Sequence, residues 1–435
     1  MKNFLNYLTK YNPDIEKIFS KSLKHSLNLL YDISLEKEKN IYLVGGIVRD
    51  IFLGRNSADI DIVLEGNCQE FAACVIPKFP VSKHRFTERF MTYNIFTKTG
   101  TNIDIASFRE ERYEYPGALP SVVPTSIEND YRRRDFSINA MYISFNEKAE
   151  LYDPLNALND LKNKTIRIIH DKSFEDDPTR IFRAVKFAAR YNFSFDANTE
   201  KLLLEAMEKN YLSTISNMRI KNEFYMLLSE KKFKAILKLF RDYKIFKFLN
   251  ITNPSDEDIE EVCKITEKII FKKMRFEYKV SKSNFILMYF LRNLSYEEKL
   301  KALTVFEMNE KALSNFIFKD EELEDIRKKL NKAQKKSEIY RCLNKLSPFK
   351  VLYFFYTIGE NKTKIKSYIF DLMEKKPLIK GADLIKAGFS QDETLGKYIE
   401  LAFNIQLDTK ETNKENIILQ LKKLNKEINA GGGDE

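Results

Sequence analysis

The distribution of glycine limits the fold of this chain more than any other sequence feature. Of the 13 glycines in the 435 residues, six lie within residues 1–117, none lies within 118–358, and seven lie within 359–435. Eight of the 11 prolines precede residue 179. Glycine and proline are the residues that most strongly interrupt regular structure. The front of the chain is therefore turn-rich, whereas a glycine-free stretch of 241 residues has little to stop a helix.

Charge divides the chain in a similar way. Residues 1–150 carry 20 Lys and Arg against 20 Asp and Glu, so the whole formal net charge of +10 lies in residues 151–435. A neutral head on a basic body is typical of proteins whose body holds a polyanion. A lysine-rich surface that only confers solubility is the alternative interpretation.

Composition excludes several classes of protein. No apolar run reaches the roughly 18 residues of a membrane-spanning helix, and polar residues interrupt the opening MKNFLNYLTKY, so we expect no signal peptide. The four cysteines lack CxxC spacing, which argues against zinc and favours reduced thiols in a cytoplasmic compartment. Because the chain has only three histidines, we expect carboxylates, arginines and metal ions to carry any chemistry.

Hydrophobic periodicity predicts an α+β head followed by helices. Apolar spacing in the head indicates helices over 14–31, 48–54 and 69–79 and strands over 41–46, 58–66, 81–90, 91–100 and 101–108. Because short turns join the last strands, we expect a small mixed sheet that is largely antiparallel.

The rest of the chain is predicted to be mostly helical. Residues 109–130 hold three prolines and a glycine, so we expect a long mobile loop there. From 132–143 onward the pattern is helical, with one extended interlude at 165–169, and 175–375 indicates consecutive amphipathic helices. The segment 381–396 indicates a small helical tail, and the terminal GGGDE is expected to be unordered.

Three carboxylates are the first candidates for chemistry. Asp59 and Asp61 stand two residues apart in one predicted strand, so both emerge on one face of the sheet, and Asp104 lies in another alternating strand. If the strands pair, the carboxylates repel one another unless they share cations, and hard divalent ions bind such oxygen donors. Two such ions about 4 Å apart activate a hydroxyl and hold a leaving phosphate oxygen. A solvated strand face is the alternative for a bare DxD.

A glycine pair precedes the acidic strand. In LVGGIVRD, Gly45 and Gly46 end a strand directly before a helix, where free N–H groups and missing side chains let a phosphate approach. With the acidic strand next in the chain, Gly45, Gly46 and Arg49 form a candidate triphosphate site. A tight turn, with Arg49 and Asp50 as an ordinary helix-surface pair, is the alternative.

Several motifs occur in order along residues 41–200, namely GGIVRD, ADIDIV, NIDIA, RRRDFSINAM, LYDPLNALNDL and FEDDPTRIFRAVKFAARY. In order and spacing they are similar to those of class II tRNA nucleotidyltransferases. That family comprises CCA-adding enzymes, enzymes that add only CC or only A, and bacterial poly(A) polymerases. The segments ISNMRIKNEF and GADLIKAG fit more loosely. The departures from the family pattern are Asn156 and Ala157 in place of glycines, Asp176 in place of Glu, and Lys186 in place of a common Arg.

The resemblance implies an architecture and a metal site. It implies a nucleotidyltransferase head of the DNA polymerase beta type over 1–145, a recognition neck over 146–210, and an elongated all-helical body and tail over 211–375 and 376–435. It further implies that two Mg²⁺ ions bind Asp59 and Asp61, and that Asp104 acts on the primer hydroxyl. Ribose and phosphate contacts are implied for Arg133, Arg134, Asp135 and Asn139, and base recognition for Asp177, Arg180 and Arg183.

Elementary chemistry agrees with two of these pairs. Asp135 and Asn139 lie four residues apart on a predicted helix, so both reach one 2′-hydroxyl. Pro178 suits a first helical turn, which places Asp177 at the helix start and Arg180 one turn later. The carboxylate of Asp177 can accept a bond from the amino group, and the guanidinium of Arg180 can donate to the ring nitrogen, that cytosine and adenine share. Uracil and guanine have a carbonyl and an N–H at these positions and therefore mismatch the pair. Helix capping and surface charge are the alternative interpretation.

The resulting hypothesis is a CTP/ATP:tRNA nucleotidyltransferase that builds or repairs the 3′-CCA end in the cytoplasm. Its basic body holds the acceptor arm and 3′ end of tRNA, with runs such as 327–336 as candidate contacts. A CC-adding enzyme, an A-adding enzyme and a poly(A) polymerase are alternatives with the same chemistry. The loop at 109–130 is the kind of mobile element that could switch the pocket from C to A, so we expect A addition to be possible. Alternatives of other classes are a non-catalytic RNA-binding protein, which the intact carboxylates oppose, and a metal-dependent nucleotide-binding regulator.

Overall fold

The computed structural model describes residues 3–57, 59–308, 310–357 and 359–430, and the chain forms two compact units, Met1–Phe248 and Leu249–Glu435. The expectation for the terminal GGGDE falls outside the described residues. All four cysteines are free thiols. Within the described part of the chain, no helix combines the length and the apolar character that crossing a membrane requires.

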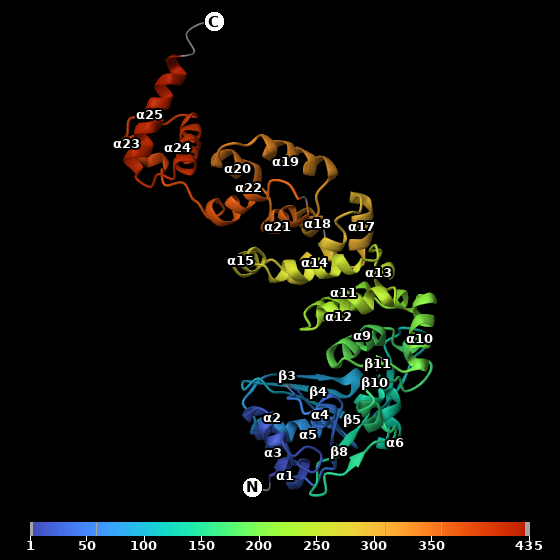
Figure 1. Ribbon diagram of the computed structural model, residues 1–435. Coiled ribbons are helices and arrows are strands. Elements are labelled where there is room, and N and C mark those ends of the chain that lie inside the picture. The colour runs from blue at the N-terminus through green and yellow to red at the C-terminus, as the bar shows by residue number, and fades with distance from the viewer. Residues whose placement is uncertain (1–2, 58, 309, 358, 431–435) are drawn as a thin grey trace. The chain divides into compact units, whose positions relative to one another are not determined.

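A seven-stranded sheet forms the centre of the first unit (Figure 1). Its strand order is β3-β4-β5-β2-β1-β8-β9, and every neighbouring pair is antiparallel except β2 and β5, which are parallel. The small, mixed and largely antiparallel sheet expected from the sequence is therefore confirmed. Its strands are β1 (Ile41–Val44), β2 (Asp59–Leu64), β3 (Val81–Thr87), β4 (Thr92–Thr97), β5 (Asn102–Ser107), β8 (Tyr142–Ser144) and β9 (Leu151–Tyr152).

The alternation of side chains along β2 fixes which face of the sheet is polar. Ile60, Ile62 and Leu64 are buried on one face, so Asp59 and Asp61 lie on the other. Helix α5 (Cys68–Val75) packs on β4 and β5, and α3 (Lys21–Glu36) packs on α5. The helix predicted over 14–31 is broken in two, because Phe19 is extended and Ser20 caps α3 by accepting a bond from the Leu23 N–H at 3.2 Å.

The predicted loop at 109–130 is instead a hairpin followed by a short helix. β6 (Arg109–Arg112) pairs antiparallel with β7 (Ser121–Pro124), and α6 (Ile127–Asp130) follows. The polar alternation of REER is a strand pattern, and two of the prolines lie in the connection between the strands. The tip is fastened to α8 (Ser173–Asp176), because the Gly117 N–H donates to the Glu175 carbonyl at 3.2 Å.

The helix predicted over 132–143 is absent from this segment. Two single 3₁₀ turns, η3 (Tyr131–Arg133) and η4 (Ser137–Asn139), precede β8. Between the turns, Phe136 forms an antiparallel bridge with Ile168, and the Ser137 N–H donates to the Arg167 carbonyl at 2.9 Å. This pairing with the extended segment predicted at 165–169 satisfies backbone groups that a helix would otherwise pair, so tertiary contacts override the local helical pattern.

The remaining elements of the first unit are short helices and one small parallel pair. Asn156, where the resemblance leads us to expect a glycine, has a left-handed backbone with φ 53° and ψ 42°, a conformation that Asn tolerates better than most residues. These elements are α1 (Phe4–Leu8), α2 (Ile15–Ile18), α4 (Gly46–Phe52), η1 (Ile76–Lys78), η2 (Glu88–Phe90), α7 (Ala157–Lys162), β10 (Thr165–Ile166), α9 (Thr179–Tyr191), β11 (Ser194–Phe195), α10 (Ala197–Glu208), η5 (Tyr211–Thr214), α11 (Asn217–Leu228), α12 (Phe233–Asp242) and α13 (Ile245–Phe248).

In the second unit, every regular element within the described residues is a helix, as the glycine-free middle of the chain predicts. The helices are α14 (Asp256–Glu267), α15 (Ile269–Tyr278), α16 (Lys282–Phe290), α17 (Tyr296–Thr304), α18 (Glu310–Phe316), α19 (Asp320–Lys332), α20 (Lys336–Leu343), α21 (Pro348–Thr357), α22 (Lys362–Ser367), the π-helix η6 (Tyr368–Leu372), α23 (Gly381–Lys386), α24 (Leu395–Thr409) and α25 (Lys414–Ala430).

Candidate active site

The polar face of the sheet borders a cavity of about 680 Å³, which Asp59, Asp61 and Asp104 all line. The parallel register of β2 and β5 places Asp61 directly beside Asp104. Asn102 Nδ2 donates to Asp59 Oδ1 at 2.8 Å, and Asn94 Nδ2 donates to Asp104 Oδ1 at 2.7 Å. The structure therefore brings the three predicted carboxylates together and holds two of them by asparagine side chains that the sequence did not single out.

Asp61 and Asp104 are held in an environment that disfavours their negative charges. Burial, followed by the charge of Asp104, raises the pKa of Asp61 to about 6, although Arg134 and the Gly46 N–H oppose the shift. Burial also raises the pKa of Asp104, against the hydrogen bond from Asn94. A bound cation relieves this kind of repulsion, and a donor set made only of oxygens suits Mg²⁺. Within the described residues, no three Asp, Glu, His or Cys side chains form a complete metal site by themselves.

The glycine pair shapes the backbone beside Asp61. Gly45 has φ 72° and ψ −132°, a region that residues with a side chain rarely adopt. A Cβ at this position would lie 3.2 Å from Asp61 Oδ2. Gly46 begins α4, and its N–H hydrogen-bonds to the Asp61 carboxylate. Glycine is thus required here to let the backbone approach Asp61, and the triphosphate contact of Gly45 and Gly46 stays a prediction.

Arg49 lies on the cavity wall, but its side chain is buried and bonded to neighbouring side chains. Its guanidinium bonds Asn139 Oδ1 and pairs with Asp50 at 3.0 Å. It also lies over the rings of Tyr191 and Phe187, at 4.6 and 5.3 Å from their centroids. Arg49 therefore connects α4 to Asn139, one of the predicted ribose contacts, and its own contact with a triphosphate is untested.

Asp130 anchors the two predicted phosphate arginines. Its fully buried carboxylate accepts a bond from Arg133 Nε and one from Arg134 Nη2, each at 2.9 Å. The Tyr142 hydroxyl donates to it at 2.8 Å. Burial alone would raise the pKa of Asp130, but the two guanidinium groups outweigh burial and hold it well below its usual range. The charge of Asp130 thereby fixes both arginines at the cavity wall.

Asp135 and Asn139 are brought together without the predicted helix. Asn139 Nδ2 donates to Asp135 Oδ1 at 3.0 Å, and Arg183 Nε donates to Asp135 Oδ2 at 2.8 Å. Burial would raise the pKa of Asp135, but Arg183 and the Asn139 bond lower it to about 2. Arg183, predicted to recognise the base, is therefore paired with a predicted ribose contact, while its side chain is 38% exposed and accessible from the cavity.

The predicted base-reading residues lie at the start of α9, as expected from Pro178. Asp177 Oδ1 accepts bonds from the Thr179 N–H and hydroxyl, at 3.2 and 2.7 Å, and from Arg219 Nη2 at 2.8 Å. No donor among the described residues bonds its second oxygen, Oδ2. Arg180 is buried, and its two terminal nitrogens donate to Ser173 Oγ and to the Arg133 carbonyl, both at 2.7 Å.

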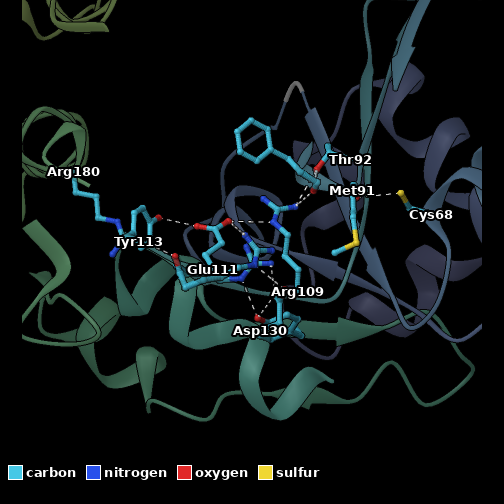
Figure 2. A network of polar contacts seen from close by, with 12 residues as sticks. Cys68, Met91, Thr92, Arg109, Glu111, Tyr113, Asp130 and Arg180 are labelled. Carbon is cyan, nitrogen blue, oxygen red and sulfur yellow. Dashed lines mark hydrogen bonds and ion pairs between the residues drawn. The ribbon is translucent and has the colours of Figure 1, made fainter. Parts of the chain in front are cut away.

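A polar network connects the hairpin, through Arg133, to α9, the helix that carries the predicted base-reading residues (Figure 2). Arg109 Nη1 donates to the Phe90 carbonyl at 2.7 Å, and Arg109 Nε bonds Glu111 at 3.1 Å. The Tyr113 hydroxyl donates to the other Glu111 oxygen at 2.9 Å, and Figure 2 shows its ring next to Arg180. The segment predicted as a loop therefore contributes ordered side chains to the cavity wall.

Besides Asn94 and Asn102, four residues of this site escaped sequence reasoning. Asp130 stands three and four residues before the two arginines it binds, a helical spacing that does carry a signal. Arg109 and Glu111 share one face of an alternating strand, a pattern hidden by the prolines that follow. Arg219 lies 42 residues beyond Asp177, and no local pattern connects the two.

Comparison with known proteins agrees with this geometry. The profile of the "Poly A polymerase head domain" matches residues 41–167, and that of the "Probable RNA and SrmB- binding site of polymerase A" matches residues 192–252. The A-adding tRNA nucleotidyltransferase of Aquifex aeolicus is 35% identical over 365 residues, covering 82% of this chain and 44% of the relative. That of Halalkalibacterium halodurans is 29% identical over 369 residues, covering 83% of each.

Solved structures extend the similarity over nearly the whole chain. The Thermotoga maritima CCA-adding enzyme complexed with tRNA_CCA superposes with a TM-score of 0.73 at 26% identity, covering 97% of this chain and 98% of that one. The chain spans less than half the length of two curated relatives, 44% and 23%. A mixed-sheet polymerase head with a helical remainder is the fold that these proteins share. The chain belongs to the class II tRNA nucleotidyltransferase and bacterial poly(A) polymerase family.

Proposed function

We propose that the chain is a template-independent nucleotidyltransferase that adds nucleotides from CTP and ATP to the 3′ end of tRNA, building or repairing the CCA terminus. The observation that carries the proposal is one cavity lined both by Asp59, Asp61 and Asp104 and by the base-reading candidates Asp177 and Arg180. The reaction needs the three carboxylates and the base-reading residues within the length of one nucleotide, because the same nucleotide contacts both. Relatives and similar structures named for A addition and CCA addition support the assignment.

In the proposed reaction the tRNA 3′-hydroxyl oxygen bonds the nucleotide α-phosphorus, and the bond from that phosphorus to the pyrophosphate oxygen breaks. Asp59 and Asp61 would hold two Mg²⁺ ions, which neutralise phosphate charge and lower the pKa of the attacking hydroxyl. Asp104, whose raised pKa suits it to accept a proton, receives the proton of the hydroxyl. The cationic wall that includes Arg134 and Lys186 faces the triphosphate, and catalysis is mainly positioning and charge neutralisation.

Base choice in this proposal depends on how Asp177 and Arg180 are held. The described donors bond Asp177 Oδ1, so Oδ2 is available to accept the amino group shared by cytosine and adenine. The bonds of Arg180 to Ser173 and to the Arg133 carbonyl fix its guanidinium plane. A carbonyl in place of the amino group would leave Asp177 unpaired, at about 1–3 kcal/mol per lost contact.

A narrower activity, addition of A alone, is favoured by one observation. Three curated relatives, at 35%, 40% and 29% identity, are named A-adding tRNA nucleotidyltransferases. A protein with this activity would use ATP and a tRNA that already ends in CC. Addition of CC alone and poly(A) synthesis use the same chemistry and are separated by their products.

The test of the chemistry compares Asp59→Asn and Asp61→Asn with the unmodified protein, using labelled CTP or ATP and tRNA with a truncated 3′ end. We expect incorporation to fall by at least about a hundredfold, as on removal of a strong transition-state interaction, while tRNA binding in a filter assay stays within twofold, or about 0.4 kcal/mol. Full incorporation by either variant would refute the assignment of these carboxylates.

A further inference from the structure

Helix α15 of the second unit, labelled in Figure 1, packs against α14 and α21. Ile270, Phe271 and Met274 are buried on this face. The Phe271 ring packs edge to face on Phe285 of α16, with centroids 5.2 Å apart. The position of the other face is therefore set by the packing of the unit.

The opposite face of α15 exposes two large apolar side chains. Phe276 is 89% exposed and Ile269 is 74% exposed, the two highest values for large hydrophobic residues in the described part of the chain. They stand seven residues apart, which is two helical turns, so they share one face. Lys272 lies between them, three residues after Ile269 and four before Phe276. The pattern is an exposed aromatic ring flanked by cations rather than a broad apolar patch.

The charge on this face is mostly unbalanced. Lys272, Arg275 and Lys279 are exposed and form no ion pair with any described residue. By contrast, the run at 327–336, which the sequence suggested for RNA contact, is partly neutralised along α19. There Arg327 and Lys328 pair with Glu324, and Lys329 pairs with Asp325 at 2.7 Å. Unlike the run at 327–336, which contains no aromatic residue, α15 combines unpaired cations with an exposed aromatic ring.

We propose that this face of α15, defined by Ile269, Lys272, Arg275, Phe276 and Lys279, binds single-stranded RNA through an unstacked base and its flanking phosphates. Every base has a flat face that stacks on an aromatic ring, and lysine and arginine neutralise the phosphates on either side. An apolar protein partner would leave the three unpaired cations buried at the contact, which is unfavourable. The surface shares only the class of partner with the proposed function and none of its residues.

The chain has no tryptophan, so Phe276→Trp introduces a single fluorescent reporter at the centre of the surface. The titrant is a short oligoadenylate, added without nucleoside triphosphate or divalent metal. We expect saturable quenching at position 276. A matched reporter, Leu419→Trp, replaces a residue of α25 that is 54% exposed, and we expect its fluorescence to stay constant. In the Phe276→Trp background, Lys272→Gln should lower the slope of log affinity against log salt by about 0.7.

Two further variants separate stacking from general charge. Phe276→Ala, at an exposed position, should keep the circular dichroism spectrum and weaken oligoadenylate binding about 5-fold to 150-fold, which equals ~1–3 kcal/mol per stacked base. Lys329→Gln, which removes a lysine already paired with Asp325, should leave affinity and salt dependence unchanged.

Three results would overturn the proposal. They are unchanged fluorescence at position 276, equal quenching at 276 and 419, and self-association that Phe276→Ala abolishes while RNA affinity is unaffected. Quenching at 276 in a protein that incorporates no nucleotide would support this surface and contradict the proposed function. Incorporation without quenching would support the proposed function and reject the surface.

Discussion

Replacing the buried carboxylate of Asp130 with an amide, Asp130→Asn, tests whether its charge organises the cavity wall. The carboxylate accepts four hydrogen bonds, from the Arg109 N–H at 3.1 Å, from Arg133 and Arg134 at 2.9 Å each, and from the Tyr142 hydroxyl at 2.8 Å. Asparagine keeps the shape but turns one acceptor into a donor that faces donors. It also leaves Arg134 without its counter-charge and leaves Arg133 with only Glu111, at 3.5 Å.

Loss of one partner from a buried ion pair destabilises a protein by about 3–5 kcal/mol. For a unit of this size, 1 kcal/mol shifts the thermal midpoint by about 2–4 °C, so the first unit should unfold roughly 6–20 °C lower. Circular dichroism measures the transition. The matched control is Asp14→Asn, because Asp14 pairs with Lys17 at 2.8 Å but is 62% exposed. That surface pair contributes about 0–1 kcal/mol, so its midpoint should shift by no more than about 4 °C.

The effect of Asp130 should also depend on pH with a definite sign. Its pKa is lower in the folded than in the unfolded protein. The stabilisation is therefore complete above the unfolded pKa of about 3.9 and declines as the pH falls below it. The difference between Asp130→Asn and the unmodified protein should shrink as the pH falls from about 6 to 3. Equal small losses for the Asp130 and Asp14 variants at neutral pH would refute the reasoning.

Three further predictions follow from the site. The pKa of Asp61 is raised to about 6, so its ionisation destabilises the metal-free fold as the pH rises through 4 to 6. In EDTA, Asp61→Asn should therefore raise the melting temperature at pH 8 but not at about pH 4. Addition of Mg²⁺ should stabilise only the unmodified protein. Arg219→Gln should reduce the preference for CTP and ATP over UTP and GTP about tenfold in a competition assay, since Asp177 loses a charged bond, and unchanged preference would reject this role. Gly45→Ala should reduce incorporation because its Cβ meets Asp61 Oδ2 at 3.2 Å, and full activity would show that the backbone adjusts.

The parts of the site that sequence reasoning predicted are those set by local geometry. A period of two along β2 was enough to place Asp59 and Asp61 on one face, and Pro178 was enough to place Asp177 at a helix start. The antiparallel sheet followed from short turns. The pairing partner of β2 was not predictable from local pattern, although the register that aligns Asp61 with Asp104 depends on it.

The errors arose where distant segments decide local structure. Phe136 pairs with Ile168, 32 residues later, and this bridge replaces the helix that the pattern at 132–143 favours. The hairpin at 109–124 has no apolar alternation, because all four residues of β6 are charged, and its prolines are typical of a loop. Arg219 reaches Asp177 only because α11 packs against α9. Such contacts join residues far apart in the chain, and single-sequence patterns carry no record of them.

The central claim, nucleotide addition to the end of tRNA, is tested most directly by product analysis. The purified protein is given tRNA that ends without CCA, after the first C, or after CC, each with CTP alone or ATP alone. The proposed function predicts CTP-dependent extension of the two shorter ends and extension of the CC-ending tRNA by a single A. The single A without any extension by CTP would narrow the activity to A addition. No extension of any tRNA with either nucleotide, or a long tail of A residues on every end, would contradict it.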